Sequence, residues 1–267
     1  MTKEFLVQQI QQKKSYLCVG LDTDITKIPK HLQHIPNAIV QFNKAIIDAT
    51  KNYCVSYKIN TAFYEAMGTK GWDIMEETLH YIPNTHFKIA DAKRGDIGNT
   101  SSYYAKTFFE TYPFDALTVA PYMGEDSIRP FLEYDNKFTI VLGLTSNAGA
   151  KDFELLKVGE RFVYEKVIES IAKWGTPNNL MFVVGATQAV ELTNIRAIVP
   201  DNFLLVPGIG FQGGSLREVS KYGMNKECGL LVSISRAIIY AGTHESFAEE
   251  AKQISLEYQT EMSSYLL

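Results

Sequence analysis

Eight short apolar runs recur along the 267 residues of this chain, and they constrain its fold more than any other feature. Each run is continuous rather than alternating in polarity, which is typical of strands that are buried on both faces. The runs cover residues 16–21, 54–59, 87–92, 116–120, 138–144, 180–185, 203–207 and 229–234. Their lengths predict eight buried strands distributed over the whole chain.

Segments with helical periodicity separate these runs. Residues 42–47 and 162–168 are examples, and residues 246–266 are expected to form a long final helix. Eight strands that alternate with helices predict a single (β/α)8 barrel, the TIM barrel, as one domain over residues 1–267. An open doubly wound sheet is the alternative architecture. Eight regular units that end in a helix, with no Pro-, Gly- or Ser-rich linker between them, favour the closed barrel.

The composition argues against nucleic acid or a membrane as partner. A net charge of −4 gives no basic surface for either, and no apolar run reaches membrane-spanning length. The first residues carry no apolar signal-peptide region. Cys18, Cys54 and Cys228 are odd in number and far apart, which indicates buried free thiols in a reducing compartment. We therefore expect a cytoplasmic protein.

Polar residues gather where the predicted strands end, and in a barrel of this kind the chemistry lies at those carboxyl ends. These residues are Asp22 and Asp24 after the first strand, Lys58 and Asn60 after the second, Asp91 and Lys93 after the third, Thr145, Ser146 and Asn147 after the fifth, and Ser233, Ser235 and Arg236 after the eighth. Two lysines and at least three carboxylates therefore converge on one rim. Structural ion pairs alone would not need so many charges.

The charged run over residues 91–100 is the densest part of that rim. Side chains two apart on a strand share a face, so Asp91 and Lys93 are expected to point the same way. Asp96 lies beyond the strand, where the chain can turn outward. Isolated charges are costly to bury, so these groups need each other or a charged ligand. A salt bridge that caps the strand is the alternative for Asp91 and Lys93 alone.

A glycine-rich stretch follows the seventh strand, at residues 207–214. Loops after the seventh and eighth strands of such barrels commonly hold a phosphate through backbone N–H groups. Gln212 offers an amide donor, and Arg236 offers a bidentate clamp. The alternative is a turn whose glycines adopt positive φ, together with an ordinary surface arginine. Both features together favour phosphate binding, with Gly210 in the binding loop.

Together these residues resemble the orotidine 5′-phosphate decarboxylase family. The motifs are Asp-x-Lys-x-x-Asp at residues 91–96, Lys58 after the second strand, Asp22 after the first, and Pro-Gly-Ile-Gly-x-Gln at residues 207–212. Residues 91–100 are similar to the longer bacterial branch of that family, and the resemblance covers roughly residues 17–237. It implies a barrel that converts orotidine 5′-monophosphate to UMP and CO2, the last step of de novo pyrimidine nucleotide synthesis. It also implies a homodimer with shared active sites and no metal or organic cofactor.

The resemblance assigns the catalytic charges. Lys93 resembles the proton donor to C6 of the pyrimidine, and Asp91 resembles the carboxylate placed against the departing CO2. Lys58 resembles the lysine that holds Asp91 and a ribose hydroxyl, and Asp22 resembles the ribose-binding aspartate. Asp96 resembles the aspartate that each subunit delivers to its partner's site.

The resemblance also assigns the remaining ligands of the nucleotide. Thr100 is expected to touch the ribose in the partner's site, and Ser146 to meet the pyrimidine when loops close. Gln212 and Arg236 resemble the phosphate ligands. Residues 148–158 are open between a lid and the start of a helix.

Two other functions remain as alternatives. A sugar-phosphate decarboxylase resembling 3-keto-L-gulonate 6-phosphate decarboxylase shares the Asp-x-Lys-x-x-Asp motif but needs Mg²⁺ and a carboxylate after the second strand. Lys58 at that position would repel a metal, and the five histidines show no metal spacing. A non-catalytic nucleotide-binding barrel would need Gln212 and Arg236 but not Lys93 between two aspartates.

Overall fold

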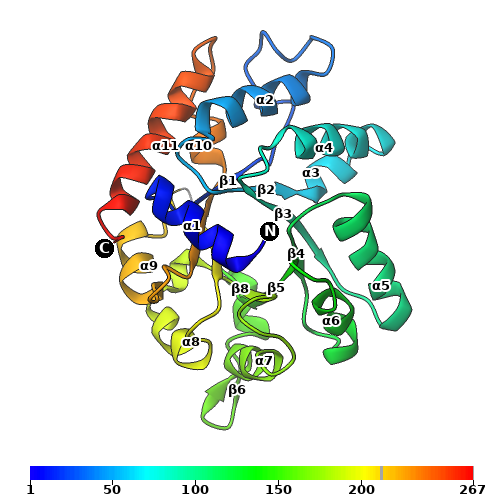
Figure 1. Cartoon of the computed structure of the whole chain (residues 1–267), viewed down its shortest axis with the longest axis vertical. Coiled ribbons are helices and arrows are strands. Elements are labelled where there is room, and N and C mark those ends of the chain that lie inside the picture. Colours follow the sequence, from blue (N-terminus) through cyan, green and yellow to red (C-terminus); the bar gives the residue numbers. More distant parts are fainter. Residues whose placement is uncertain (211–212, 267) are drawn as a thin grey trace. The chain divides into compact units, whose positions relative to one another are not determined.

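Eight strands form a closed barrel in the computed structural model of the chain, which describes residues 1–210 and 213–266 (Figure 1). The barrel order is β1-β10-β9-β8-β5-β4-β3-β2. Its strands are β1 (Leu17–Gly20), β2 (Ser56–Asn60), β3 (Phe87–Arg94), β4 (Ala116–Val119), β5 (Phe138–Leu144), β8 (Leu180–Val184), β9 (Leu204–Pro207) and β10 (Leu230–Ile234). Each corresponds to one of the eight apolar runs, so the predicted (β/α)8 barrel is confirmed.

Helices follow the strands along the chain, as the alternating pattern predicted. The α-helices are α1 (Lys3–Lys13), α2 (Ala38–Thr50), α3 (Thr61–Glu65), α4 (Thr69–Tyr81), α5 (Gly98–Lys106), α6 (Glu125–Leu132), α7 (Val163–Ile171), α8 (Leu192–Ile198), α9 (Leu216–Gly223), α10 (Arg236–Ile239) and α11 (Phe247–Ser263). Shorter turns are the π-helix η1 (Thr107–Thr111) and the 3₁₀ helices η2 (Ala148–Asp152) and η3 (Ala186–Glu191). The long final helix predicted for residues 246–266 is α11.

The chain divides into two compact units. We call Phe5–Ala92 with Ser233–Leu267 the terminal unit, and Met1–Glu4 with Lys93–Val232 the central unit. The single domain over residues 1–267 stays a prediction.

The terminal unit contains β1, β2 and the first part of β3 as parallel neighbours. Gly20 pairs with Lys58, and Asn60 pairs with Asp91, so the carboxyl ends of these strands lie together. Helices α2 and α11 lie side by side over this unit (Figure 1), where the Phe42 and Phe247 rings stack at 5.3 Å. The apolar residues of α2 recur at helical spacing and are buried, which explains why the helix packs there.

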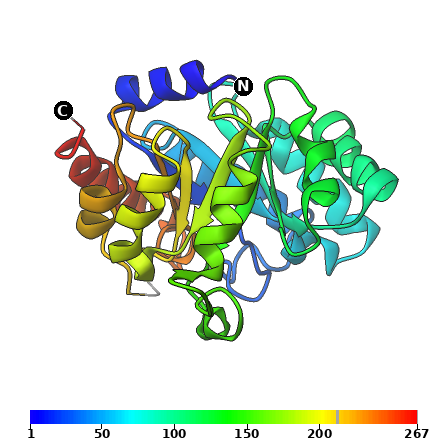
Figure 2. The ribbon, with the colours of Figure 1, turned by 90° about the horizontal axis from the view of Figure 1, so that it is seen from below.

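The central unit contains β4, β5, β8 and β9, which pair in parallel in that order. In Figure 2 these strands, green to yellow, run side by side. The register between β5 and β8 shifts between Leu142 and Leu144, immediately before the predicted site residue Ser146. Such a bulge redirects the end of a strand and is common beside active sites.

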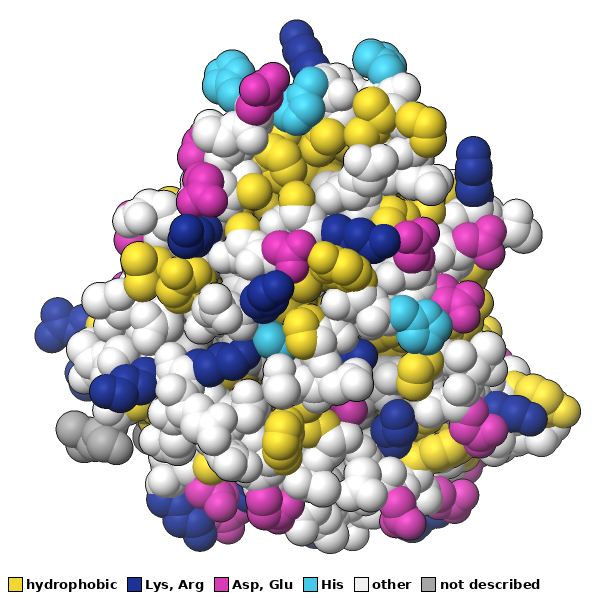
Figure 3. Space-filling model, turned by 45° about the horizontal axis from the view of Figure 1, so that its top comes forward, with side chains coloured by type: hydrophobic (Ala, Val, Ile, Leu, Met, Phe, Trp, Pro, Cys, Tyr) yellow, Lys and Arg dark blue, Asp and Glu magenta, His cyan; other side chains and the backbone are white. Residues whose placement is uncertain are grey.

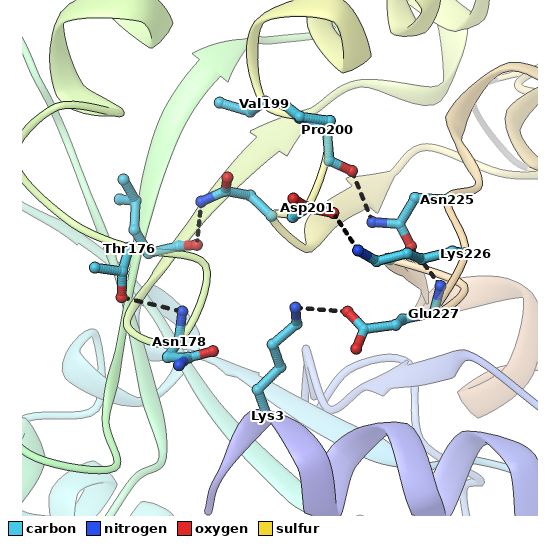
Figure 4. Close-up of polar contacts among 12 residues, drawn as sticks. Lys3, Thr176, Asn178, Val199, Pro200, Asp201, Asn225, Lys226 and Glu227 are labelled. Carbon is cyan, nitrogen blue, oxygen red and sulfur yellow. Dashed lines mark hydrogen bonds and ion pairs between the residues drawn. The ribbon is translucent and has the colours of Figure 1, made fainter.

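Ion pairs lie near the amino ends of strands in the central unit (Figure 4). Lys3 pairs with Glu227 at 2.6 Å in the turn before β10, and Lys226 pairs with Asp201 at 3.3 Å in the turn before β9. Lys226 is largely exposed, so its pair contributes little to stability. Both pairs lie at the strand ends opposite to those that carry the predicted chemistry.

The surface carries both charge signs close together. On the face drawn in Figure 3, Lys and Arg side chains alternate with Asp and Glu side chains, in keeping with the small net charge. Across residues 1–210 and 213–266, no helix is both long enough and apolar enough to cross a membrane. The three cysteines are free and buried, as predicted.

Candidate active site

A lysine held between two carboxylates lies at the carboxyl ends of β1, β2 and β3. The Nζ atom of Lys58 lies 3.1 Å from Asp91 Oδ2 and 3.3 Å from Asp22 Oδ1. The Lys58 residue is only 4% exposed. The structure therefore brings together three of the predicted site residues, each contributed by a different strand or by the residues just after it.

The two carboxylates keep the Lys58 amine charged. Burial opposes the ammonium form and by itself lowers the pKa of Lys58. The attraction of Asp22 and Asp91 outweighs that effect, so the pKa of Lys58 lies well above its usual value.

Lys93 follows Asp91 by two residues but has an unusual backbone. Its φ is 48°, in the left-handed region that non-glycine residues rarely adopt. Its backbone N–H donates to Thr118 Oγ1 on β4 at 2.9 Å. Strained backbone of this kind clusters at functional sites, where the surrounding structure has to hold it.

Strand β3 runs through Arg94, two residues further than its apolar run. The shared face of Asp91 and Lys93 was predicted from the alternation of side chains on an extended strand. The left-handed turn at Lys93 interrupts that alternation, so the shared face stays a prediction.

Asp96 and Thr100 lie where β3 passes into α5. The Asp96 carboxylate accepts a hydrogen bond from the Ile97 N–H at 2.8 Å, and its carbonyl accepts one from Ser101 at 2.7 Å. Thr100 is exposed in the first turn of α5. Both residues are therefore beyond the strand, as the sequence predicted.

Ser146 lies just after β5, in a segment clasped by Glu154. The Glu154 carboxylate accepts hydrogen bonds from the Thr145 N–H at 2.6 Å and from the Thr145 hydroxyl at 2.8 Å. A Cβ on Gly185 would lie 2.7 Å from Ser146 N, so the glycine permits this close approach. The segment left open by the sequence, residues 148–158, forms η2 and then β6 (Lys157–Val158) of a short hairpin with β7 (Arg161–Phe162).

Three described glycines of the stretch after β9 have backbone conformations typical of turns. Gly208, Gly210 and Gly213 have positive φ, and the N–H of Gly213 donates to the Gly210 carbonyl at 2.9 Å. The glycines therefore meet the backbone requirement of a turn, which leaves their role toward phosphate a prediction. Gln212 lies outside the described residues. Arg236 is exposed and opens α10 directly after β10.

Sequence reasoning missed several supports of these groups. It did not identify Thr118, which accepts a hydrogen bond from the Lys93 N–H, or Tyr240, which donates one to the Asp22 carbonyl. It placed Ser235 at a strand end but predicted no partner for it. Ser235 donates a hydrogen bond to Asp22 Oδ2 at 2.6 Å. Only the position of Ser235 beside Arg236 could have drawn attention to it. Within the described residues, no group of three or more His, Cys, Asp and Glu side chains could hold a metal ion.

A family model described as "Orotidine 5′-phosphate decarboxylase / HUMPS family" matches residues 15–251. A curated protein of Christiangramia forsetii named orotidine 5′-phosphate decarboxylase is 56% identical over 269 residues, which covers 100% of this chain and 99% of that protein. These similarities extend over the strands that carry every predicted site residue.

Solved structures are similar over nearly the whole chain. A putative orotidine-monophosphate-decarboxylase from Toxoplasma gondii matches with a TM-score of 0.86 and 31% identity, covering 98% of this chain and 97% of that one. The Leishmania donovani UMP synthase matches with a TM-score of 0.84 and 37% identity over 96% of this chain. This chain spans 56%, about half, of the Leishmania protein.

Proposed function

The chain belongs to the orotidine 5′-phosphate decarboxylase family, a family of carboxy-lyases in pyrimidine synthesis, and from this membership we propose how its residues decarboxylate orotidine 5′-monophosphate to UMP. The observation that carries the proposal is the buried Lys58 ammonium between Asp22 and Asp91. An electrostatic decarboxylation needs charges that are fixed in position before the reaction, and alternating charges of opposite sign meet this need.

Loss of CO2 from C6 leaves a carbanion in the plane of the pyrimidine ring, where the ring π-system cannot delocalise it. Without an electron sink, a fixed positive charge beside C6 has to stabilise the developing carbanion. We assign this role to the Lys93 ammonium, which then donates its proton to C6. The strained backbone at Lys93 and its hydrogen bond to Thr118 support the assignment.

Lys58 organises the carboxylates in this proposal. Its ammonium holds Asp91 against the carboxylate of the substrate and donates toward a ribose hydroxyl, while Asp22 binds the ribose. Because Lys58 lies next to both aspartates, it stays charged although it is buried. Asp91 then either opposes the charge of the bound substrate or orients Lys93.

The remaining contacts bind the rest of the nucleotide. Ser146 meets the pyrimidine, whereas Gly210, Gln212 and Arg236 hold the 5′-phosphate. Because the phosphate is remote from C6, its binding energy can be used for loop closure and expressed in the transition state. We assign no metal and no organic cofactor to this reaction, and we place the protein in the cytoplasm, in keeping with its reduced, buried thiols.

A homodimer with shared sites completes the proposal. Four large apolar side chains are exposed around Asp96, the β4–α6 loop and α5: Ile97 (57%), Tyr103 (65%), Tyr122 (91%) and Met123 (44%). A Cβ on Gly95 would lie 3.4 Å from Met123 Cε, so the loop beside Asp96 lies close to Met123. Exposed apolar groups gathered in this way indicate an interaction surface. Asp96 and Thr100 on this surface would then enter the site of the second copy.

The proposed function is tested by the loss of orotidylate absorbance with EDTA present. We expect wild-type turnover with EDTA, which a magnesium-dependent enzyme or a binding protein would not give. Lys93→Ala should lower kcat at least a thousand-fold, about 4 kcal/mol, while UMP still binds. Retention of more than about a tenth of kcat would remove Lys93 as the proton donor.

The shared site is tested by mixing inactive variants. Homodimers of Lys93→Ala or Asp96→Ala should be nearly inactive. A heterodimer of the two places both lesions in one site and leaves the other site intact, so subunit exchange should restore up to about half the activity per exchanged dimer. Confirmed exchange without recovered activity would show that Asp96 serves its own chain.

A further inference from the structure

Both oxygens of the Asp22 carboxylate have a partner in the terminal unit. Oδ1 lies 3.3 Å from the Lys58 ammonium, and Oδ2 accepts a hydrogen bond of 2.6 Å from the Ser235 hydroxyl. With one oxygen held on each side, the plane of the carboxylate is fixed as well as its position. Lys58 is already part of the proposed reaction, but Ser235 is not.

Gly20 makes the contact between Ser235 and Asp22 possible. A Cβ built on Gly20 would lie only 1.8 Å from Ser235 Oγ and 2.9 Å from Ser235 Cβ. Any side chain at position 20 would therefore displace the hydroxyl. Gly20 ends β1 two residues before Asp22, so the strand that carries the carboxylate also leaves the room that the hydroxyl occupies.

A second contact fastens the same two segments. The hydroxyl of Tyr240 donates to the Asp22 carbonyl at 3.0 Å and accepts a hydrogen bond from the Asp24 N–H at 2.7 Å. The Tyr240 ring stacks on Phe42 of α2 at 6.2 Å, which fixes its position. Burial raises the pKa of the Tyr240 hydroxyl to about 12, so it keeps the proton that it donates.

Arg236 lies between these two contacts in the sequence. We propose that Ser235 is a positioning residue for Asp22 and that, together with Tyr240, it fastens the segment that presents Arg236 to the segment that presents Asp22. This inference rests on the proposed function, in which Arg236 holds the phosphate and Asp22 the ribose. The hydroxyl at position 235 thus sets the distance between the two ends of the ribose phosphate that the protein binds.

The first test is a double-mutant cycle. Ser235→Ala keeps Cβ and removes the hydroxyl, so the affinity for UMP should fall roughly 10-fold to 100-fold, as for the loss of a hydrogen bond to a charged group. In an Asp22→Ala background the same change should alter UMP affinity less than about two-fold. An equal loss in both backgrounds would show that Ser235 does not act through Asp22.

The second test separates the ribose from the phosphate. Ser235→Ala should weaken the binding of uridine, because Asp22 contacts the ribose, and should weaken UMP by at least the same factor, because UMP also depends on the position of Arg236. Arg236→Ala should weaken UMP alone. If Ser235→Ala weakened UMP and spared uridine, Ser235 would serve the phosphate and the inference would be wrong.

Matched variants separate positioning from folding. Ser255 also buries a hydroxyl in the terminal unit, where it donates to the Ala251 carbonyl at 2.8 Å, so Ser255→Ala should cost similar stability and leave nucleotide affinity unchanged. Tyr240→Phe should reproduce the ligand pattern of Ser235→Ala more weakly. A wild-type protein without decarboxylase activity would overturn the proposed function. An active wild type with an unaffected Ser235→Ala variant would overturn only this inference.

Discussion

Two lysines of the terminal unit lie at opposite ends of its strands. Their surroundings shift their pKa values in opposite directions. Lys58, after β2, lies between two carboxylates that raise its pKa. Lys13, at the end of α1, donates to the Lys51 and Cys54 carbonyls at 2.9 Å and lies 2.8 Å from His86 Nε2. Desolvation by burial lowers the pKa of Lys13.

The partners of an amine that is drawn out of water, rather than burial itself, therefore decide whether its charged form is stabilised. At Lys58 two carboxylates offset the effect of burial and keep the amine charged. At Lys13 it satisfies one amine with carbonyls and keeps His86 neutral. Burial, followed by repulsion from Lys13, lowers the pKa of His86 to about 4. The arrangement at Lys58 is suited to a reaction that needs fixed charges. The arrangement at Lys13 is suited to joining α1 to the strands.

Replacement of the two lysines by methionine gives the largest expected contrast. Lys58→Met removes the ammonium that lies between Asp22 and Asp91, so we expect kcat to fall about a thousand-fold or more, near 4 kcal/mol. Lys13→Met should leave kcat within about two-fold, since it contacts none of the proposed site residues. Steady-state kinetics of both variants measures this contrast. Comparable losses in kcat would show that Lys58 is no more important for the reaction than Lys13.

Acid should destabilise the protein through His86. The unfolded chain takes up a proton on this residue below about pH 6.5, whereas the folded protein does so only near pH 4. Stability is therefore present above the unfolded pKa and declines as the pH falls from 6.5 to 4, by about 3 kcal/mol. Urea unfolding along this pH range measures the decline.

His86→Gln should remove most of that decline. The matched change His80→Gln alters an exposed histidine and should retain the wild-type pH dependence. A decline that persisted unchanged in His86→Gln would mean that other groups carry the acid sensitivity.

Lys13→Met should also be measurably less stable at neutral pH. Two carbonyls lose a charged donor, which predicts a loss of roughly 1 to 3 kcal/mol in the free energy of unfolding. Removal of the neighbouring ammonium should at the same time raise the pKa of His86 and make the acid decline smaller. Urea titrations at pH 7 and pH 5 test both statements, and an unchanged stability at pH 7 would show that Lys13 is dispensable.

The smallest expected effect tests how the third lysine, Lys93, is held. Thr118→Val removes the hydroxyl that accepts from the Lys93 N–H, and kcat/KM should fall roughly five-fold, about 1 kcal/mol. Thr139 is a matched control on the adjacent strand β5, because its buried hydroxyl has no hydrogen-bond partner among the described residues. Thr139→Val should therefore be neutral or slightly stabilising. An equal effect of the two substitutions on kcat/KM would show that the Thr118 hydroxyl does not act through Lys93.

The strands and the main charges were predictable because their signals are local. A strand buried on both faces, such as Phe138–Leu144, reads as a continuous apolar run, and its carboxyl end is the next polar residue. The sequence predicted that Asp22, Lys58 and Asp91 gather at one rim, whereas the Lys58–Asp91 contact was expected from the family resemblance and the Lys58–Asp22 contact was not predicted. The link from Ser235 to Asp22 spans 213 positions and depends on the missing side chain of Gly20, which no local pattern encodes. The left-handed backbone of Lys93 was also unpredictable from the sequence, because lysine has no preference for that conformation.

The clearance between Gly20 and Ser235 also constrains how this sequence can change over time. One small volume serves both positions, so a side chain at 20 and a hydroxyl at 235 exclude each other. Substitutions at these positions should therefore occur in pairs among descendants of this sequence, as linked changes rather than independent ones. A mutational library that varies position 20 alone would sample mainly steric conflict, whereas one that varies the two positions together could find compatible pairs.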